Sequence, residues 1–283
     1  MRVSGKPGSG RQWPSRSAQG HGGPLWTADE EQYLREHYAK APAKEVAAAM
    51  GRSLAAVRVR AIKMGLPSHH RVAVNSLVPD YFQVIDTHMK AYLLGLLMAD
   101  GCISASNQLA LALSAKDIEL VELLRDELAP AGRLKSYLTK EGKPMAVFKV
   151  QSPALAADLA RHGVVQAKTL ITRWPAELPE HLDASFTCGY FDGDGSLLPK
   201  WVYRWTVVCG STEFLEQMQE RVRAHTGVKV GGLYRDTRHE NAWSICATGE
   251  PVRVLDEWIH RDVPGLARKC LAAVLAAGEA ASA

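Results

Sequence analysis

The sequence is short of two things: paired cysteines and long apolar runs. Its five cysteines stand at positions 102, 188, 209, 246 and 270, form no CxxC pair and are odd in number. This pattern argues against a disulfide scaffold and a zinc ribbon, and it favours a reducing compartment. No secretory leader is recognisable, and no apolar run is long enough to span a bilayer. We therefore expect a soluble cytoplasmic protein with no membrane partner.

A net positive charge is present only in the N-terminal quarter. The 283 residues carry a formal net charge of +4. Residues 1–72 hold 12 Lys and Arg against 5 Asp and Glu, a balance of +7, so the remaining residues carry −3. A basic segment of this kind favours contact with phosphates. The hydrophobic share of 47% suits a globular chain with a core, and the length leaves room for about two domains.

One apolar stretch occurs twice. The first copy reads YLLGLLMADG at 92–101, and the second reads FTCGYFDGDG at 186–195. Each has a glycine at its fourth position and ends in Asp-Gly, and Asp100 and Asp194 lie 94 residues apart. Such an echo indicates a duplicated structural unit. Each run is long enough for a buried helix and too short to cross a bilayer.

The glycines of the two copies predict how the helices pack and end. Gly95 and Gly189 occupy the same place in the two copies. Because a glycine inside a helix costs about 1 kcal/mol relative to alanine, we predict that each marks a point where the other helix approaches closely. Gly101 and Gly195 are predicted to end the helices as caps in the left-handed conformation.

Asp100 and Asp194 then fall in the last turn of each predicted helix. Carbonyl partial charges already make that end negative, so a carboxylate is unfavourable there. If the helices pack in parallel, the two acids lie side by side, and a divalent cation with oxygen ligands would stabilise them. The plain structural alternative is that Asp-Gly marks a turn and that the helix glycine serves packing alone.

The N-terminal region predicts an arm followed by three short helices. Residues 1–23 are rich in Gly, Ser, Arg and Pro and are predicted to be a disordered basic arm. In residues 24–66, Thr27 and Glu30 form a capping box that opens the first helix. Gly51 ends the second helix and Ser53 caps the third.

The second and third of these helices have the spacing of a helix-turn-helix. Ala47 is the small residue at the helix crossing, Gly51 the turn glycine and Val57 the core residue. The stretch resembles the Myb/SANT-like helix-turn-helix of phage and bacterial DNA-binding proteins, which implies a third helix lying in a major groove. The alternative is a three-helix module whose basic face serves solubility or a protein contact. The candidate DNA contacts are Arg52, Arg58, Arg60 and Lys63.

The rest of the chain divides into a linker, two repeats and a tail. We predict a linker at 67–85, a first repeat at 86–178, a second repeat at 179–276 and a tail at 277–283. Each repeat shows the order helix, two strands, helix, two strands, helix. Asp117 is predicted to cap the middle helix of the first repeat. Strands are predicted at 102–106, 108–114, 133–139 and 145–151, and again at 196–198, 201–209, 228–236 and 242–248.

Residues 93–101 and 187–195 resemble the two motifs of a LAGLIDADG homing endonuclease of the single-chain, two-motif type. The resemblance extends over residues 86–272. It implies an α+β fold of two pseudo-symmetric αββαββα repeats, here preceded by the small three-helix helix-turn-helix domain. The first motif has Met98 where the family often has Asp, but that position is not the metal ligand.

The resemblance also implies the catalytic residues. Asp100 and Asp194 would bind the catalytic metal, with Gly101 and Gly195 beside them. Lys168 follows Asp100 by 68 residues and Lys269 follows Asp194 by 75. A lysine in this region of each repeat often reaches the family's active site, although either lysine could be only a helix-end charge. We expect Mg²⁺ as the cofactor, because it prefers a few carboxylates plus phosphate and water; Mn²⁺ or Ca²⁺ can substitute in binding.

Outward-facing strand residues are the candidate contacts to bases and phosphates, since arginine suits guanine, glutamine suits adenine, and Lys or Arg can hold phosphate. Polar residues on a strand's outer face are otherwise simply solvated. The candidates are Arg133, Lys135, Lys149 and Gln151 in the first sheet and Arg204, Arg235, Arg238 and Asn241 in the second.

These observations lead to one functional expectation and two alternatives. We expect a monomeric, Mg²⁺-dependent, site-specific endonuclease of double-stranded DNA, in the cytoplasm of a bacterial or phage-infected cell. It would cut a long target site and leave short 3′ overhangs, as the resemblance implies. One alternative is a catalytically inactive DNA-binding transcriptional regulator with the same fold, and the other is an intron RNA-splicing maturase.

Overall fold

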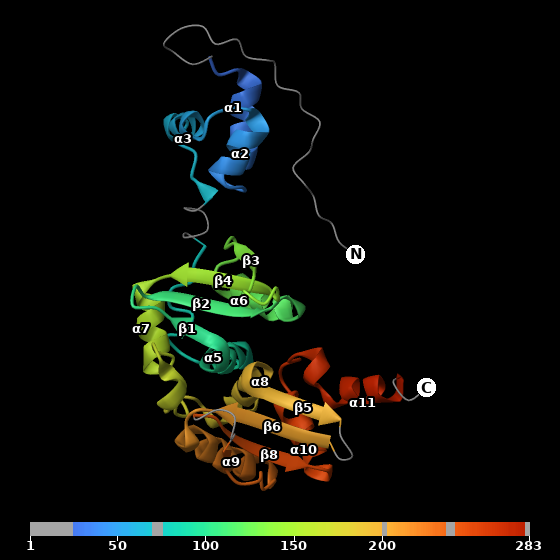
Figure 1. The fold of residues 1–283 in the computed structure, drawn as a ribbon. Coiled ribbons are helices and arrows are strands. Elements are labelled where there is room, and N and C mark those ends of the chain that lie inside the picture. The colour runs from blue at the N-terminus through green and yellow to red at the C-terminus, as the bar shows by residue number, and fades with distance from the viewer. Residues whose placement is uncertain (1–24, 70–75, 200–202, 236–240, 281–283) are drawn as a thin grey trace. The chain divides into compact units, whose positions relative to one another are not determined.

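The computed structural model describes residues 25–69, 76–199, 203–235 and 241–280 (Figure 1). The chain forms two compact units, Met1–Ser76 and Leu77–Ala283. Within the described ranges, no helix has the length and apolar character that a membrane crossing requires.

The N-terminal unit consists of three helices, α1 (Ala28–His37), α2 (Ala43–Met50) and α3 (Leu54–Lys63). The predicted capping box is confirmed: Thr27 Oγ1 accepts from the Glu30 amide at 3.3 Å, and Glu30 Oε2 accepts from the Thr27 amide at 3.0 Å. Gly51 ends α2 with a φ of 61°, and Ser53 caps α3 as predicted. Val57 and Leu34 are fully buried in the small core.

The second unit contains two repeats with the same order of elements. The first comprises α5 (His88–Asp100), β1 (Gly101–Ile103), β2 (Gln108–Ser114), α6 (Ile118–Leu128), β3 (Leu134–Leu138), β4 (Pro144–Gln151) and α7 (Pro153–Arg161). The second comprises α8 (Asp183–Asp194), β5 (Gly195–Pro199), β6 (Tyr203–Cys209), α9 (Thr212–Thr226), β7 (Tyr234–Arg235), β8 (Trp243–Thr248) and α10 (Glu250–Ile259). The predicted α+β class and αββαββα order are confirmed.

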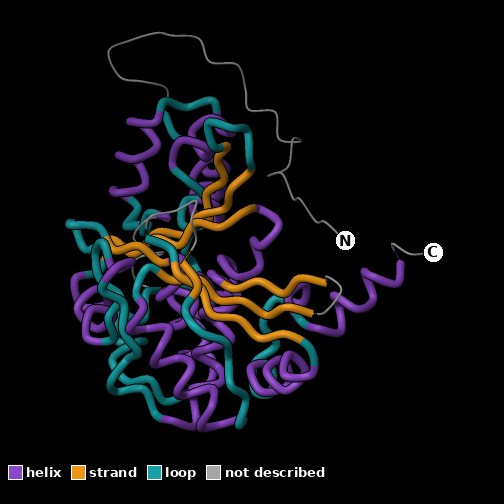
Figure 2. Tube along the Cα trace, turned by 60° about the horizontal axis from the view of Figure 1, so that its bottom comes forward, coloured by secondary structure: helices purple, strands orange, loops and turns teal. Residues whose placement is uncertain are grey.

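Each repeat forms a four-stranded antiparallel sheet, and the two sheets have equivalent strand orders. The first is β1-β2-β4-β3 and the second is β5-β6-β8-β7. Helix α6 packs on β2 and β4, and α9 and α10 pack on β6 and β8. The strands run beside the helices in both views (Figures 1 and 2).

Inner faces of both sheets are apolar. Leu109, Leu111 and Leu113 alternate onto the buried face of β2, as predicted, and Trp205 and Val207 do the same on β6. Because successive side chains of a strand point to opposite faces, every second residue faces the helices, and the residues between them point outward. This parity decides which side chains can meet a ligand on the outer faces.

Helices α5 and α8 pack against each other where the two repeats meet (Figure 1). A Cβ on Gly95 would lie 2.8 Å from the amide nitrogen of Tyr190 and would overlap the Phe186 carbonyl. One on Gly189 would lie 2.9 Å from the amide nitrogen of Leu96. The prediction that each glycine marks the close approach of the other helix is confirmed.

Strand β7 is shorter than the predicted range of 228–236. The side-chain amide of Gln219 on α9 donates to the carbonyl oxygens of Val230 (3.2 Å) and Gly231 (2.6 Å). These two carbonyls therefore accept from a helix side chain, although the Gly231 amide still donates to the Cys246 carbonyl of β8 at 2.7 Å. Strand β1 likewise ends before the predicted residue 106, at a turn that places Asn107 at a φ of 59°.

Two segments lie differently from the sequence-based divisions. Residues 77–85, assigned to the linker from sequence, belong to the second unit, because Phe82 and Ile85 are buried in its core. Helix α11 (Leu271–Ala280) was not predicted, and it runs into residues assigned to the tail. Leu271 and Val274 attach it to the same core.

Candidate functional site

The C-terminal ends of α5 and α8 lie together. At the N-terminal ends, His88 Nδ1 lies 2.9 Å from Ser185 Oγ. At the C-terminal ends, a Cβ on Gly193 would lie 2.7 Å from Asp100 Oδ2. The two helices therefore run in the same direction, and Asp100 lies against α8 one residue before Asp194.

The helices end directly in strands. Gly101 has φ −69° and ψ 146°, and Gly195 has φ −101° and ψ 164°. The predicted left-handed caps are therefore wrong: the chain extends at once into β1 and β5. Glycine is required for a different reason, because a Cβ at either position would lie 2.5 Å from a carbonyl oxygen, that of Leu97 or that of Phe191.

The surroundings of both acids raise their pKa values. The pKa of Asp100 is raised to about 6, mainly by burial and in addition by the negative charge of Asp194. The pKa of Asp194 is also raised by partial desolvation, although the residue is exposed at the surface. Two carboxylates that resist ionisation side by side are stabilised by a cation between them.

A buried lysine donates hydrogen bonds to backbone carbonyls at the C-terminal end of each of the two helices, α5 and α8. Lys168, 8% exposed, donates from Nζ to the carbonyl oxygens of Gly101 and Ala99. Burial lowers the pKa of its ammonium group, and the charges of Asp194 and Asp100 oppose that shift. Lys168 thus lies beside Asp100, as its equivalent spacing in the sequence suggested.

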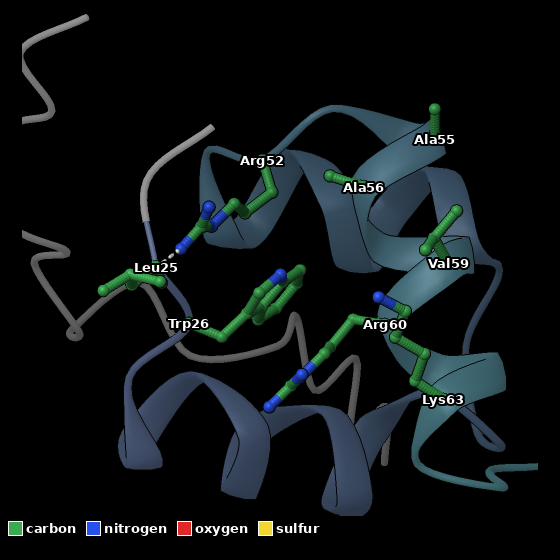
Figure 3. A pocket seen from close by; sticks show the side chains of 8 residues that line it. All are labelled: Leu25, Trp26, Arg52, Ala55, Ala56, Val59, Arg60 and Lys63. Carbon is green, nitrogen blue, oxygen red and sulfur yellow. Dashed lines mark hydrogen bonds between the residues drawn. The ribbon is translucent and has the colours of Figure 1, made fainter. Parts of the chain in front are cut away.

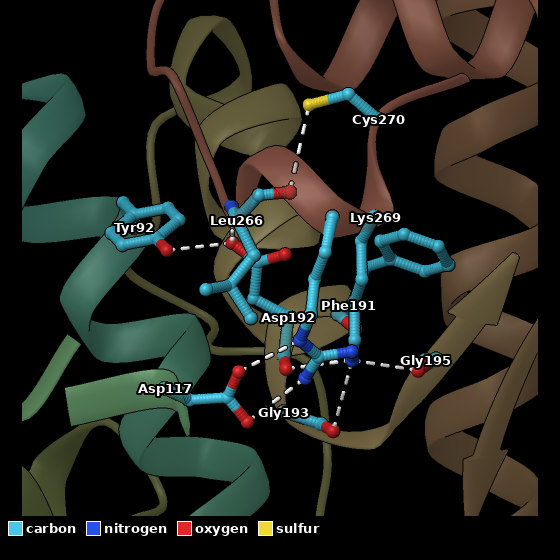
Figure 4. Close-up of polar contacts among 10 residues, drawn as sticks. Tyr92, Asp117, Phe191, Asp192, Gly193, Gly195, Leu266, Lys269 and Cys270 are labelled. Atoms are coloured by element: carbon cyan, nitrogen blue, oxygen red, sulfur yellow. Dashed lines mark hydrogen bonds and ion pairs between the residues drawn. The ribbon is translucent and has the colours of Figure 1, made fainter. Parts of the chain in front are cut away.

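Lys269 makes the same arrangement in the second repeat, with more contacts (Figure 4). It is 6% exposed. Its Nζ donates to four carbonyl oxygens, those of Phe191 (2.9 Å), Asp192 (2.7 Å), Gly193 (3.3 Å) and Gly195 (2.7 Å). Burial lowers the pKa of Lys269 to about 8, and the charge of Asp192 opposes that shift.

Each lysine segment also touches the other repeat. Arg268, next to Lys269, forms a bidentate ion pair with Asp117 at 2.7 and 2.9 Å. A Cβ on Gly210 would lie 2.7 Å from the carbonyl oxygen of Thr169, next to Lys168. Asp117 occupies the N-cap position of α6, as predicted, but its side chain makes no capping hydrogen bond. The carboxylate pairs with Arg268 instead, so the predicted capping role is wrong.

The donor set fits a divalent cation that keeps most of its own water. Among the described residues, no group of three or more His, Cys, Asp or Glu side chains could hold a metal ion. Asp100 and Asp194 offer two carboxylates, and the carbonyls of Gly101 and Gly195 already accept from lysines. Mg²⁺ typically binds through one or two carboxylates plus water and substrate phosphate.

The first sheet brings three predicted DNA contacts onto one outer face. Lys135 pairs across from Val147, Lys149 from Ala110, and Gln151 from Gln108. All three strand positions are opposite in parity to the buried leucines, and all three residues are exposed. Gln151 also donates from Nε2 to the Ser106 carbonyl at 3.0 Å. Arg133 is exposed and lies just before β3.

The second sheet does not group its candidates in this way. Arg204 is exposed on the outer face of β6, where Nη2 lies 3.6 Å from Cys246 Sγ. Arg235 lies opposite Trp243, which in turn lies opposite the buried Cys209. The strand position of Arg235 is therefore on the inner face of the sheet and not on the outer one. Asn241 is exposed in the turn before β8, and Arg238 lies outside the described residues.

In the N-terminal unit, Arg52 points into its own fold (Figure 3). Its guanidinium group pairs with Glu30 at 3.0 and 2.7 Å, donates to the Leu25 carbonyl at 2.8 Å and lies 4.5 Å from the Trp26 ring centroid. Arg60 forms an ion pair with Glu31 of α1.

Arg58 and Lys63 remain exposed on α3. Val59 and Ile62 accompany them, 53% and 75% exposed. These two apolar residues were missed from sequence, because Val and Ile in a helix ordinarily indicate a buried face. The exposed face of α3 therefore combines two cations with two branched apolar side chains.

Comparisons with known proteins give a fold similarity and no sequence relative. No family model matches the sequence, and no curated protein matches it at a significant level. Full-length DUF199/WhiA from Thermatoga maritima is 16% identical, with a TM-score of 0.47, over 71% of this chain and 64% of that chain.

Two DNA complexes are also similar in structure. The homing endonuclease I-WcaI bound to its DNA recognition sequence is 13% identical with a TM-score of 0.47, over 68% of this chain and 91% of that chain. I-DmoI in complex with DNA and Ca is 16% identical with a TM-score of 0.42, over 62% of this chain and 89% of that chain.

Proposed function

We propose that this chain is a monomeric, Mg²⁺-dependent, site-specific endonuclease of double-stranded DNA of the LAGLIDADG type. The observation that carries the proposal is the meeting of Asp100 and Asp194 at the adjoining ends of two packed helices. Burial and the charge of Asp194 both raise the pKa of Asp100, so a cation bound there would stabilise its ionised form. Two carboxylates at the C-terminal ends of two helices are electrostatically unfavourable unless a cation binds between them.

The chemistry divides between the metal and the chain's own groups. Mg²⁺, when bound, supplies charge neutralisation on the phosphate and a more acidic water. Asp100 and Asp194 would hold it, one from each repeat, so that each strand to be cut would have an acid nearby. Lys168 and Lys269 fix the helix ends through backbone carbonyls and place positive charge beside the acids, where negative charge develops on the phosphate. One acid for each strand supports a double-strand break.

The outer face of the first sheet supports a duplex partner. Lys135, Lys149 and Gln151 share that face, and Arg133 lies at its edge. Cations hold phosphates, and a glutamine can read adenine. In the N-terminal unit we propose a helix-turn-helix in which α3 enters a major groove, with Arg58 and Lys63 as its charged contacts. Together these surfaces would cover a long target.

One observation favours a second candidate, a DNA-binding regulator of the same architecture. Within the described residues, no third His, Cys, Asp or Glu side chain joins the acidic pair to form a metal site. A regulator would use the same surfaces without chemistry, and the acids would then be helix-end residues alone. A maturase would instead prefer folded intron RNA to duplex DNA.

Cleavage selection on a randomised duplex library, in Mg²⁺ and in EDTA, tests the proposal. We expect Mg²⁺-dependent double-strand breaks at one site with short 3′ overhangs. The variant carrying both Asp100→Asn and Asp194→Asn is the matched control, and it should retain the selected duplex without cutting it. Retention without breaks by the unmodified protein would contradict the nuclease and favour the regulator. Preferential retention of folded intron RNA would favour the maturase.

A further inference from the structure

Asp192 is a buried acid that the proposed chemistry does not use. It lies on α8, two residues before Asp194, and is 3% exposed. Its Oδ2 accepts from the Tyr92 hydroxyl at 2.6 Å and from the Leu266 amide at 2.8 Å (Figure 4). Its Oδ1 is buried and has no hydrogen-bond partner within the described part of the chain. Burying a carboxylate with one oxygen unmatched is unfavourable.

The fold itself does not require an acid at this position. The equivalent residue in the first motif is Met98, which is 2% exposed and packs near Gly163. An apolar side chain therefore satisfies the same place on the other motif helix. The free-energy cost of burying the Asp192 carboxylate must then be offset by the two segments that its hydrogen bonds hold in place.

One of these bonds holds the segment that carries Lys269. Leu266 begins a tight turn, because the Lys269 amide donates to the Leu266 carbonyl at 2.8 Å. Asp192 thus pins the start of the turn, while Lys269 Nζ at its end reaches back to the Asp192 carbonyl at 2.7 Å. Both attachments are to the same turn of α8, so the lysine's position depends directly on Asp192.

The other bond ties this arrangement to the first repeat. Tyr92 belongs to α5, and its hydroxyl shares Asp192 Oδ2 with the Leu266 amide. The ion pair of Arg268 with Asp117 attaches the same turn to the first repeat a second time. The thioether of Met98 is only a weak acceptor and cannot replace a carboxylate in such a role.

We propose that Asp192 is a positioning residue for Lys269, and that its replacement by Met98 in the first repeat makes the two halves of the site unequal. The inference rests on the proposed nuclease function for its effect on cutting. The strand served by the second repeat is cut with a lysine held by the side chain of Asp192. The strand served by the first repeat is cut with a lysine whose segment no acid side chain anchors in this way among the described residues.

Two substitutions at Asp192 separate positioning from mere packing. Asp192→Asn keeps a side-chain oxygen that can accept both hydrogen bonds. Asp192→Met reproduces the residue of the first motif and removes both. Met98→Leu is the matched control in the first repeat. Each variant is tested as full-length protein on the selected duplex, with the two strands labelled separately, and its amide hydrogen exchange is measured without DNA.

We expect Asp192→Met to slow the cutting of one strand by about 10–100-fold, with unchanged duplex affinity, so that a nicked product accumulates. Asp192→Asn should restore the strand ratio to within about threefold, and Met98→Leu should leave it unchanged. Exchange in Asp192→Met should rise at residues 264–269 and not in the sheets. An unchanged strand ratio, or an equal loss on both strands, would overturn the inference.

The exchange measurement separates this inference from the proposed function. If the unmodified protein does not cut, the nuclease proposal fails. Faster exchange confined to residues 264–269 in Asp192→Met, reversed in Asp192→Asn, would still support the positioning role. Unaltered exchange in that segment would refute it, whether or not the protein cuts.

Discussion

At Gly95 and Gly189, the backbones of α5 and α8 come into direct contact. A methyl group on either one would overlap a carbonyl oxygen of the facing helix, that of Phe186 or that of Tyr92. Neither neighbour can move without shifting its whole helix. The close approach therefore fixes the separation of the helix ends that carry Asp100 and Asp194.

We predict that Gly95→Ala and Gly189→Ala each lower the free energy of unfolding by about 3 kcal/mol, because the overlap is with backbone. Thermal and urea unfolding measure the change. Gly232→Ala is the matched control, since its Cβ would meet open space. Equal stability of all three variants would show that the helices can separate without cost.

Asp100→Asn and Asp194→Asn should each reduce double-strand cutting by about 100-fold or more, because each removes one of the two carboxylates that we propose as metal ligands. Duplex affinity should survive, since neither acid contributes attraction to phosphate. Supercoiled plasmid carrying the selected site reports nicked and linear products separately. Unchanged cutting by both single variants would exclude this pair as the catalytic site.

Lys168→Met and Lys269→Met should each slow cutting by about 10²–10³-fold with duplex affinity retained, because a preorganised positive charge beside the phosphate is lost. Their effects on stability should differ. Lys269 donates to four carbonyl oxygens and Lys168 to two. Lys269→Met should therefore lower the melting temperature more than Lys168→Met, and the reverse order would contradict the contacts described.

The affinity for divalent metal should fall as the pH drops through about 6. In the metal-free protein the pKa of Asp100 is about 6, and a metal binds the deprotonated form, so below that pH a proton competes with it. Calcium titrations by calorimetry at pH 7.5, 6.5 and 5.5 measure the effect. The Asp100→Asn variant should bind weakly at all three, and a pH-independent affinity in the unmodified protein would contradict the assignment.

The same shift has the opposite effect on stability in EDTA. A carboxylate whose pKa is higher in the folded than in the unfolded state binds its proton more tightly when folded. Its contribution therefore stabilises the fold as the pH falls from about 7 towards about 4. The free energy of unfolding is measured at several pH values for the unmodified protein and for Asp100→Asn. The difference between the two proteins isolates this contribution.

Arg52 and Arg58 should behave differently although both were candidate DNA contacts. Arg52→Ala should destabilise the N-terminal unit by about 3 kcal/mol, because it leaves the buried Glu30 without its ion pair. Arg58→Ala should leave the fold unchanged and reduce the salt dependence of duplex binding by about one phosphate contact. Circular dichroism and binding at several salt concentrations separate the two, and equal loss of structure would contradict this division.

The order of elements could be predicted because it depends on local patterns. The repeated glycine and Asp-Gly positions indicated both motif helices, and alternating leucines indicated β2. The contacts that position the site could not be predicted. Arg268 and Asp117 are 151 residues apart in the chain, and no periodicity links them.

Local signals also failed where one residue type serves two geometries. A glycine after a helix usually indicates a left-handed cap, yet Gly101 continues directly into a strand. It is a glycine because the space beside Leu97 excludes a side chain. Arg52 looked like its exposed neighbour Arg58 in sequence. Only the three-dimensional position of Glu30 distinguishes an arginine that holds its own unit together from one that faces solvent.

The pairing of α5 with α8 also matters while the protein is being made. Every residue from Ala91 to Met98 is buried in the finished structure, but the helix that covers this segment is encoded about a hundred residues later. At a synthesis rate of roughly 5–20 residues per second, α5 leaves the ribosome about 5–20 s before its partner exists. During that interval the nascent first repeat presents an uncovered apolar helix, a surface that chaperones bind.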